Sequence, residues 1–419
     1  KKTYFTASGV TPGWVSGDPI IVTVDNIEVA NKQLTLGLGL EESGITGWHT
    51  IQIKALYRIG DLDLSNFISA YESALANAKT VAATTETISA TVLAALNATI
   101  NTYDADKVDK EDAEALEAAT TALTEATNSA NTSIASYALI ATGTISTDDA
   151  TGWASSTPKG TFALNTWSTA ESVDQSEMVR NYIQVWDGSN ALGEGKLYYT
   201  LTGLEPGEKI YVQALCRVFN SNEGSLEGAS FFVNSDEVAI GGTICGGGYN
   251  TKAQYGTFQI TGTVDSEGKL QFGISNSSTS ELTWLCIKNV KIMTSADAIT
   301  AKNAEWTALK EKANTLANTP NDNETATSAL STAITTQQAN VDAATNAEAV
   351  ISATASLKSA MTTFVNAATP TGDNQFDMTF ILTNPDLTGH ATWAATAGWY
   401  TEQSGGNSQV MQNDEVKSS

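Results

Sequence analysis

Two segments of the chain place aromatic, amide and guanidinium groups at every second position. In the first, RNYIQVWDG, the apolar residues Ile183 and Val185 alternate with larger polar and aromatic residues. Successive side chains of a β-strand point to opposite faces, so a strand here carries its polar and aromatic groups together on one face. The residues predicted for that face are Arg180, Tyr182, Gln184 and Trp186.

The second segment, KIYVQALCRVF, alternates in the same way. The residues predicted to face a core are Val212, Ala214, Cys216 and Val218. The residues predicted for the opposite face are Tyr211, Gln213, Leu215 and Arg217. If the two strands lie adjacent, these side chains form a platform of rings and hydrogen-bonding groups. Aromatic rings pack on the C–H faces of sugars, so the platform predicts a glycan site. The alternative is that the rings pack under a covering loop or against a neighbouring helical bundle.

Predicted loops hold further candidates. Trp153, Trp167 and Tyr249 lie in or beside such loops, where binding residues commonly gather. The pairs Asp148–Asp149 and Asp236–Glu237 offer oxygen ligands for a structural Ca²⁺. No run resembles a DxDxDG calcium loop, so solvated acidic loops are the alternative and the sequence leaves a metal open.

Motifs for catalysis are absent from the sequence. His49 and His390 are its two histidines, which removes most histidine-based triads and zinc sites. No GxSxG, HExxH or P-loop motif occurs, and nothing marks one pair among the 46 acidic residues as the carboxylates of a glycosidase. We therefore expect a protein that is not an enzyme and has no cofactor, unless it binds a structural Ca²⁺.

Composition and charge exclude other partners. The chain has 419 residues, of which 41% are hydrophobic, enough for several domains with cores. Its net charge of −24 repels the backbone of a nucleic acid. No apolar run approaches the roughly 18 residues that span a bilayer. The segment KKTYFTASGV lacks the apolar region of a signal peptide, so we expect any targeting segment to lie outside this sequence.

Cysteines occur at three positions, Cys216, Cys245 and Cys286, without a CxxC spacing. This pattern is not typical of a metal knuckle or a disulfide framework. We expect small buried apolar side chains, with a bridge between Cys216 and Cys286 as the alternative.

A long repeat indicates how the domains are organised. NKQLTLGLGLEESGITGW at 31–48 resembles GKLQFGISNSSTSELTW at 268–284, and each copy ends on a tryptophan. The separation of Trp48 and Trp284, about 236 residues, indicates a duplicated domain pair rather than a short solenoid repeat. Because the two tryptophans repeat with the fold, we expect them in core or sheet-closing positions.

Apolar spacing alternates between two periods along the chain. Helical spacing predicts three-helix bundles at 61–141 and 295–369, whereas two-residue alternation predicts a complete antiparallel β-sandwich at 142–294. The ends resemble the last strands of one sandwich, at 1–60, and the first strands of another, at 370–419.

Two local features are predicted inside these domains. The alternating runs on either side of GLEPGE predict a β-hairpin that turns at Pro206 and Gly207. In the first bundle, Asp109 is predicted to cap the third helix and Asp112 to lie in its first turn.

The segments LTGLEPGEKIYVQALCR and TWLCIKNVKI, with a GW pair near each domain start, resemble a known family. They are similar to the galactose-binding-like jelly-roll modules of large secreted or surface proteins of Bacteroidota, in which sandwiches alternate with FIVAR-like helical bundles. The resemblance implies an extracellular or cell-surface location and carbohydrate binding, through motifs that are structural. It transfers no set of ligand residues, and IKNV stands here where an acidic IDN is common.

We therefore predict a multidomain protein in which jelly-roll β-sandwich modules alternate with three-helix bundles. The predicted function is noncatalytic glycan binding or adhesion outside the cell, with the bundles as spacers. Its partners would be a polysaccharide and copies of itself in a surface assembly, without nucleic acid or a membrane span. The alternatives are a structural surface protein, such as a fibre, layer or stalk, and an accessory region of a larger glycoside hydrolase.

Overall fold

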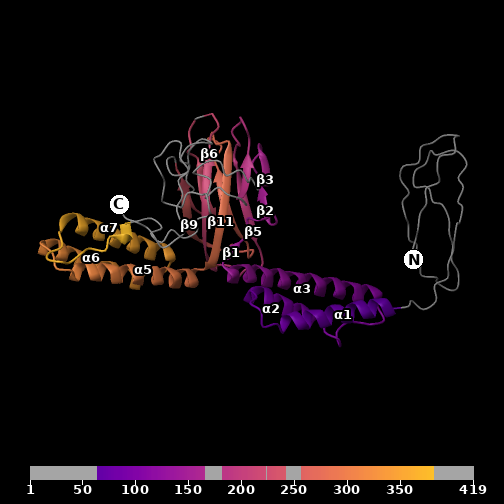
Figure 1. Cartoon of the computed structure of the whole chain (residues 1–419). Coiled ribbons are helices and arrows are strands. Elements are labelled where there is room, and N and C mark those ends of the chain that lie inside the picture. Colours follow the sequence, from indigo (N-terminus) through magenta and orange to yellow (C-terminus); the bar gives the residue numbers. More distant parts are fainter. Residues whose placement is uncertain (1–63, 166–181, 223, 242–255, 382–419) are drawn as a thin grey trace, which may run out of the picture. The chain divides into compact units, whose positions relative to one another are not determined.

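The computed structural model describes residues 64–165, 182–222, 224–241 and 256–381, within the compact unit that begins at Leu64. The predicted partial sandwich at 1–60 lies outside these residues, as does most of the one at 370–419. Candidate residues that also lie outside are Arg180, Trp167 and Tyr249. Figure 1 shows the order of helices and strands along the described part.

The first helical group consists of α1 (Ser65–Ala82), α2 (Ala90–Thr102) and α3 (Ala113–Thr142). Apolar faces of the three helices share one core, as the helical spacing predicts. Side chains at its centre are Tyr71, Leu75, Leu96, Leu116 and Leu123.

The cap predicted for α3 is wrong by three residues. Asp112 is the N-cap, and its Oδ1 accepts hydrogen bonds from the backbone N of Glu114 (2.9 Å) and Ala115 (3.2 Å). Asp109 instead accepts from the backbone N of Glu111 in the turn before the helix. Both aspartates are good capping residues, so propensity alone does not decide between them.

The chain then forms two antiparallel sheets (Figure 1). The six-stranded sheet has the order β3-β4-β11-β6-β9, with β1 also paired to β11, and the five-stranded sheet has the order β2-β5-β10-β7-β8. The strands are β1 (Thr144–Ile145), β2 (Trp153–Ser155), β3 (Thr161–Asn165), β4 (Tyr182–Trp186), β5 (Gly195–Leu201), β6 (Lys209–Phe219), β7 (Ala229–Val233), β8 (Asp236–Ile240), β9 (Gly256–Thr263), β10 (Leu270–Asn276) and β11 (Trp284–Thr294).

The inner faces of the two sheets bury one apolar core, which makes this region a β-sandwich. The alternation predicted for β4 and β6 is confirmed, because the residues predicted to face a core do so. These residues are Ile183, Val185, Val212, Ala214, Cys216 and Val218.

The hairpin predicted between β5 and β6 is wrong. β5 pairs with β2 and β10, whereas β6 pairs with β11 and β9 in the other sheet. Gly207 has a φ of 83°, so the chain does turn there, but Leu204 enters the core and the connection crosses between the sheets. Two alternating runs around a turn look the same in sequence whether they pair with each other or face each other across a core.

Strand β11 pairs with β6 along one edge and contains a bulge at which the strand on its other edge changes from β4 to β1. Its pairing with β6 shifts between Lys288 and Lys291, and Asn289 has a φ of 50°. Before the bulge β11 pairs with β4 as far as Ile287, and after it with β1 from Val290. The extra residue allows Ile287 and Val290 both to face the core.

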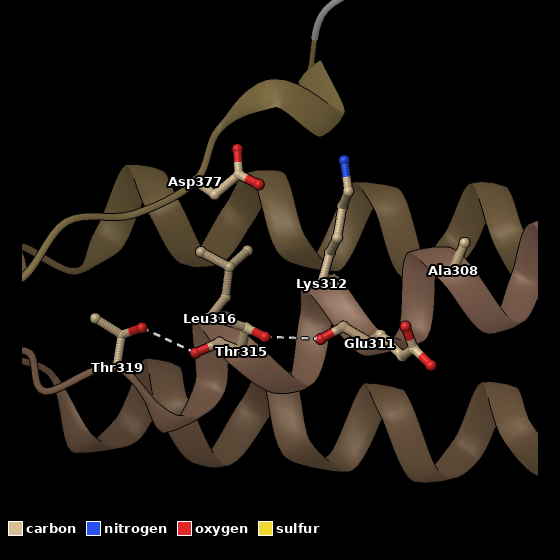
Figure 2. A pocket seen from close by; sticks show the side chains of 7 residues that line it. All are labelled: Ala308, Glu311, Lys312, Thr315, Leu316, Thr319 and Asp377. Carbon is tan, nitrogen blue, oxygen red and sulfur yellow. Dashed lines mark hydrogen bonds between the residues drawn. The ribbon is translucent and has the colours of Figure 1, made fainter.

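The second helical group consists of α5 (Ser295–Asn318), α6 (Glu324–Asp342) and α7 (Ala347–Ala367), which share a core of their own. After α7 the chain packs back on this group, and the rings of Phe376 and Phe364 lie 5.1 Å apart. Figure 2 shows a groove beside α5 that no aromatic side chain lines. Its lining residues are Ala308, Glu311, Lys312, Thr315, Leu316, Thr319 and Asp377.

A carboxylate joins the sandwich to the first helical group. Glu205, in the loop between β5 and β6, accepts hydrogen bonds from Ser89 Oγ (2.6 Å), Thr91 N (2.9 Å) and Thr91 Oγ1 (2.8 Å). Ser89 is the N-cap of α2, so the negative charge lies at the positive end of that helix. In the same loop, Glu208 accepts a hydrogen bond from Tyr137 of α3 (2.6 Å). We call these contacts the Glu205 clasp.

Replacing Glu205 by alanine is expected to lower the free energy of unfolding by about 1 kcal/mol, the scale of a lost helix cap that is partly solvated. Hydrogen bonds from Ser89 and Thr91 lower the pKa of Glu205 from its ordinary value of 4.5. The stabilisation is therefore present above pH 4.5 and is lost as the pH falls through the lowered pKa. Urea denaturation of the wild type and of Glu205→Ala, from neutral pH to below pH 4.5, measures this difference in the free energy of unfolding.

The matched control is Glu117→Ala, because Glu117 is exposed on α3. An unchanged stability of the Glu205→Ala variant at neutral pH would contradict the clasp, and so would a difference that grows on acidification.

Candidate functional site

The outer face of the six-stranded sheet holds the candidate residues of β4 and β6. These strands are not adjacent, because β11 lies between them and adds its own side chains to the face. Two rows of cross-strand neighbours result, Trp186–Trp284–Phe219 and Gln184–Cys286–Arg217. The sequence did not indicate that β11 would supply the centre of both rows.

The centre of this face is closed by packing. Tyr182 and Trp284 form a buried cluster with Cys286 and are only 1% and 7% exposed. The guanidinium carbon of Arg217 lies 5.3 Å from the centroid of the Trp284 ring, and Arg217 is 1% exposed. Such a buried cation–π contact stabilises the sheet. Tyr182 and Arg217 are therefore packed side chains, in contact with β11 of the same sheet.

One end of the face is covered by the second helical group. Tyr211 is buried against Ala298 of α5 and Ala347 of α7. Its hydroxyl donates to Gln259 Oε1 (2.7 Å) and lies 3.2 Å from Gln213 Oε1. Burial, and next the nearby carboxylates of α5 and α7, raise the pKa of Tyr211. This tyrosine is a contact between sheet and helices, and a ligand has no access to its ring.

The other end of the face is open. Trp186, the last residue of β4, is 49% exposed. A Cβ atom on Gly188 would lie 3.6 Å from Cζ2 of its ring, so the indole lies over the turn that follows the strand. The half-buried amide of Gln184 precedes it on the same face. We call Trp186 and the turn 187–190 the Trp186 platform.

Hydrogen bonds hold the turn of this platform in place. Asp187 Oδ1 accepts from the backbone N of Ser189 (2.9 Å) and from the backbone N (2.7 Å) and Nδ2 (3.2 Å) of Asn190. These donors, the backbone groups first, lower the pKa of Asp187. Asn222 Nδ2 donates to the carbonyl of Ser189 (3.0 Å) from the loop after β6. A fixed carboxylate and two amides thus form or hold the turn over which the exposed ring lies.

The remaining described candidate, Trp153, lies in the sandwich core rather than at a loop surface. It is buried, its Nε1 donates to the carbonyl of Ser146 (3.1 Å), and its ring packs edge-on against Tyr199 at 5.4 Å. Trp153 begins β2, which sequence periodicity did not reveal because the strand has only three residues.

Cys216 and Cys286 lie on opposite faces of the six-stranded sheet. Cys216 belongs to the sandwich core, and Cys286 belongs to the outer cluster with Trp284. Their side chains point away from each other across the sheet, so the bridge left open by the sequence does not form.

Among the described residues, no group of three or more His, Cys, Asp or Glu side chains is placed to hold a metal ion. Within the same residues, no helix has the length and apolarity needed to cross a membrane.

No protein-family model matches the chain, and no curated protein matches it. Solved structures similar to part of it include the CBM22-1 xylan-binding domain of Xyn10C from Paenibacillus barcinonensis, with 13% identity over 36% of this chain and 90% of that domain (TM-score 0.24). TmCBM61, solved with β-1,4-galactotriose, is 12% identical over 35% of this chain and 92% of that module (TM-score 0.25). The N-terminal cellulose-binding domain of β-1,4-glucanase C from Cellulomonas fimi is 18% identical over 35% of this chain and 92% of that domain (TM-score 0.19).

The two tryptophans of the outer face should respond differently to truncation. Trp284→Ala removes a buried ring and is expected to cost about 3–5 kcal/mol of unfolding free energy, whereas Trp186→Ala removes an exposed one and should cost less than about 1 kcal/mol. Chemical denaturation of both variants measures the difference. Equal losses at the two positions would mean that Trp186 is a packed residue like its neighbour.

Proposed function

We propose that the β-sandwich is a noncatalytic glycan-binding module of an extracellular or cell-surface protein. The single observation that carries this proposal is the exposure of Trp186 at the end of a face on which the rings of Tyr182, Tyr211 and Trp284 are buried. In the same proposal the sandwich is a jelly-roll, and the helical groups are spacers of a repeated array like those of Bacteroidota surface proteins.

The chemistry of the Trp186 platform supports a sugar. An indole that is half exposed offers an apolar surface to the C–H face of a pyranose ring, and desolvation of both surfaces favours contact. Asn190 in the turn that follows Trp186, and Asn222 bonded to that turn, offer amides to sugar hydroxyls. The net charge of −24 disfavours uronate or sulfate groups, so we propose an uncharged glycan.

The pKa values of the described carboxyl groups mark no acid of the kind that a glycosidase uses. A glycosidase needs an acid whose pKa is raised, so that it is protonated at neutral pH. Every carboxyl group with a displaced pKa among the described residues has a lowered one. These groups are Asp104, Asp187, Glu205 and Asp377.

One set of observations favours a second candidate function, a structural surface protein. Gly143 alone separates α3 from β1, and Thr294 both ends β11 and caps α5. With the Glu205 clasp, these junctions leave little freedom between helices and sandwich, which suits a stiff repeated array. Negative-stain electron microscopy of the native surface material tests this function, which predicts ordered polymers rather than separate molecules.

Binding to a panel of polysaccharides tests the leading proposal. Affinity electrophoresis in xylan, β-glucan, galactan and polygalacturonate should show retardation by at least one neutral polymer and none by the acidic one. Trp186→Ala should weaken that binding at least about tenfold, or about 1.4 kcal/mol, because the ring is the centre of the contact.

The matched control is Tyr198→Ala, because Tyr198 is a half-buried aromatic on the outer face of the other sheet. This variant should bind like the wild type. Binding that survives in Trp186→Ala, or that fails equally in both variants, would remove the proposed site.

A further inference from the structure

We infer that the Trp186 platform recognises the end of a saccharide chain, one or two terminal sugar units, and not an internal stretch of a long chain. This inference rests on the proposed function and concerns the kind of ligand that the same site takes. It follows from which parts of the outer face are closed and which are open.

Along the direction of its strands, the face is closed at the end away from Trp186. At one end, Tyr211 and Met293 pack against Ala298 and Ala347, so the first turns of α5 and α7 occupy the space above the sheet. Thr261 of β9 donates to Glu348 of α7 (3.0 Å), which fixes the helix against the neighbouring strand. A sugar chain lying along the strands therefore meets helices at this end.

The middle of the face is closed as well. Tyr182, Arg217, Trp284, Cys286 and Lys288 all lie on its outer side and are all buried. An extended chain gains affinity by stacking successive sugar rings on successive exposed aromatic surfaces. The described residues of this face offer one exposed ring, that of Trp186. There is thus an exposed stacking surface for one ring, since the next ring of the row, Trp284, is buried and Phe219 on β6 is half-buried.

The edge beyond Trp186 provides polar groups instead of a further aromatic surface. Asp187 Oδ1 accepts the bonds that hold the turn, whereas Oδ2 accepts none from the described residues. The hydrogen bonds from the turn lower the pKa of this carboxyl group most, and the positive charge of Lys159 lowers it further by a smaller amount. On the cross-strand side, Thr161 of β3 is exposed next to Trp186. The hydroxyl of Thr161 on the neighbouring strand and the carboxylate in the turn that follows Trp186 suit the many hydroxyls of a terminal sugar.

Isothermal titration with β-1,4-linked xylo-, cello- and galacto-oligosaccharides of one to six units tests this inference. Each molecule has one end of each kind whatever its length, so molar affinity should rise up to the disaccharide and then stay within about threefold to the hexasaccharide. Asn222→Ala, at the rim of the platform, should weaken disaccharide and hexasaccharide binding by the same factor.

A second readout uses the polymer that binds best. Partial acid hydrolysis creates chain ends at constant mass, and the amount of protein bound per gram should rise in proportion to the new ends. Affinity that climbs more than about tenfold from disaccharide to hexasaccharide would overturn the inference and leave the proposed function standing. Absence of binding to every oligosaccharide and every polymer would overturn the proposed function, and the inference with it.

Discussion

The alternation of side chains along β11 determines both the core of the sandwich and its outer face. Leu285 and Ile287 point into the core, whereas Trp284 and Cys286 point outward. Because the period is two, a slip of one residue would exchange these sets, so the buried face specifies the register strongly. The same strand ends at Thr294, which caps α5, and thereby determines where the second helical group covers the sheet.

The sequence predicts the elements and the faces better than it predicts their neighbours. Helical spacing finds all three helices of each described group, and alternation assigns Ile183 and Val185 to the core. Pairing is not encoded in alternation, so the crossing of the chain between sheets after β5 is missed. For the same reason alternation predicts the same outward-facing position for Tyr182, Trp186 and Tyr211. In the structure Tyr182 lies in a buried cluster, Trp186 is half exposed to solvent, and Tyr211 is covered by α5 and α7.

The distinction between packed and exposed rings gives the outer face its proposed role. Aromatic residues at a strand more often contribute buried area than recognition, and most of this face follows that rule. Trp186 departs from it because β4 ends there and the next residues form a turn held by Asp187. The half-exposed indole leaves about half of its surface available for contact with a ligand, and we propose that it serves binding. The buried centre of the face is the reason we propose that role at the tip of β4.

Residue-resolved oxidative footprinting by hydroxyl radicals tests the central claim most directly, namely that Trp186 is the one exposed ring among the described aromatic side chains of this face. Our account predicts that Trp186 is oxidised far faster than Trp153, Trp284 and Trp306, which are buried, and that a bound saccharide protects Trp186 alone among these four. Oxidation of Trp284 and Tyr182 as fast as Trp186 would show an open face and would contradict the account. Oxidation of Trp186 that a saturating saccharide leaves unchanged would contradict its role in binding.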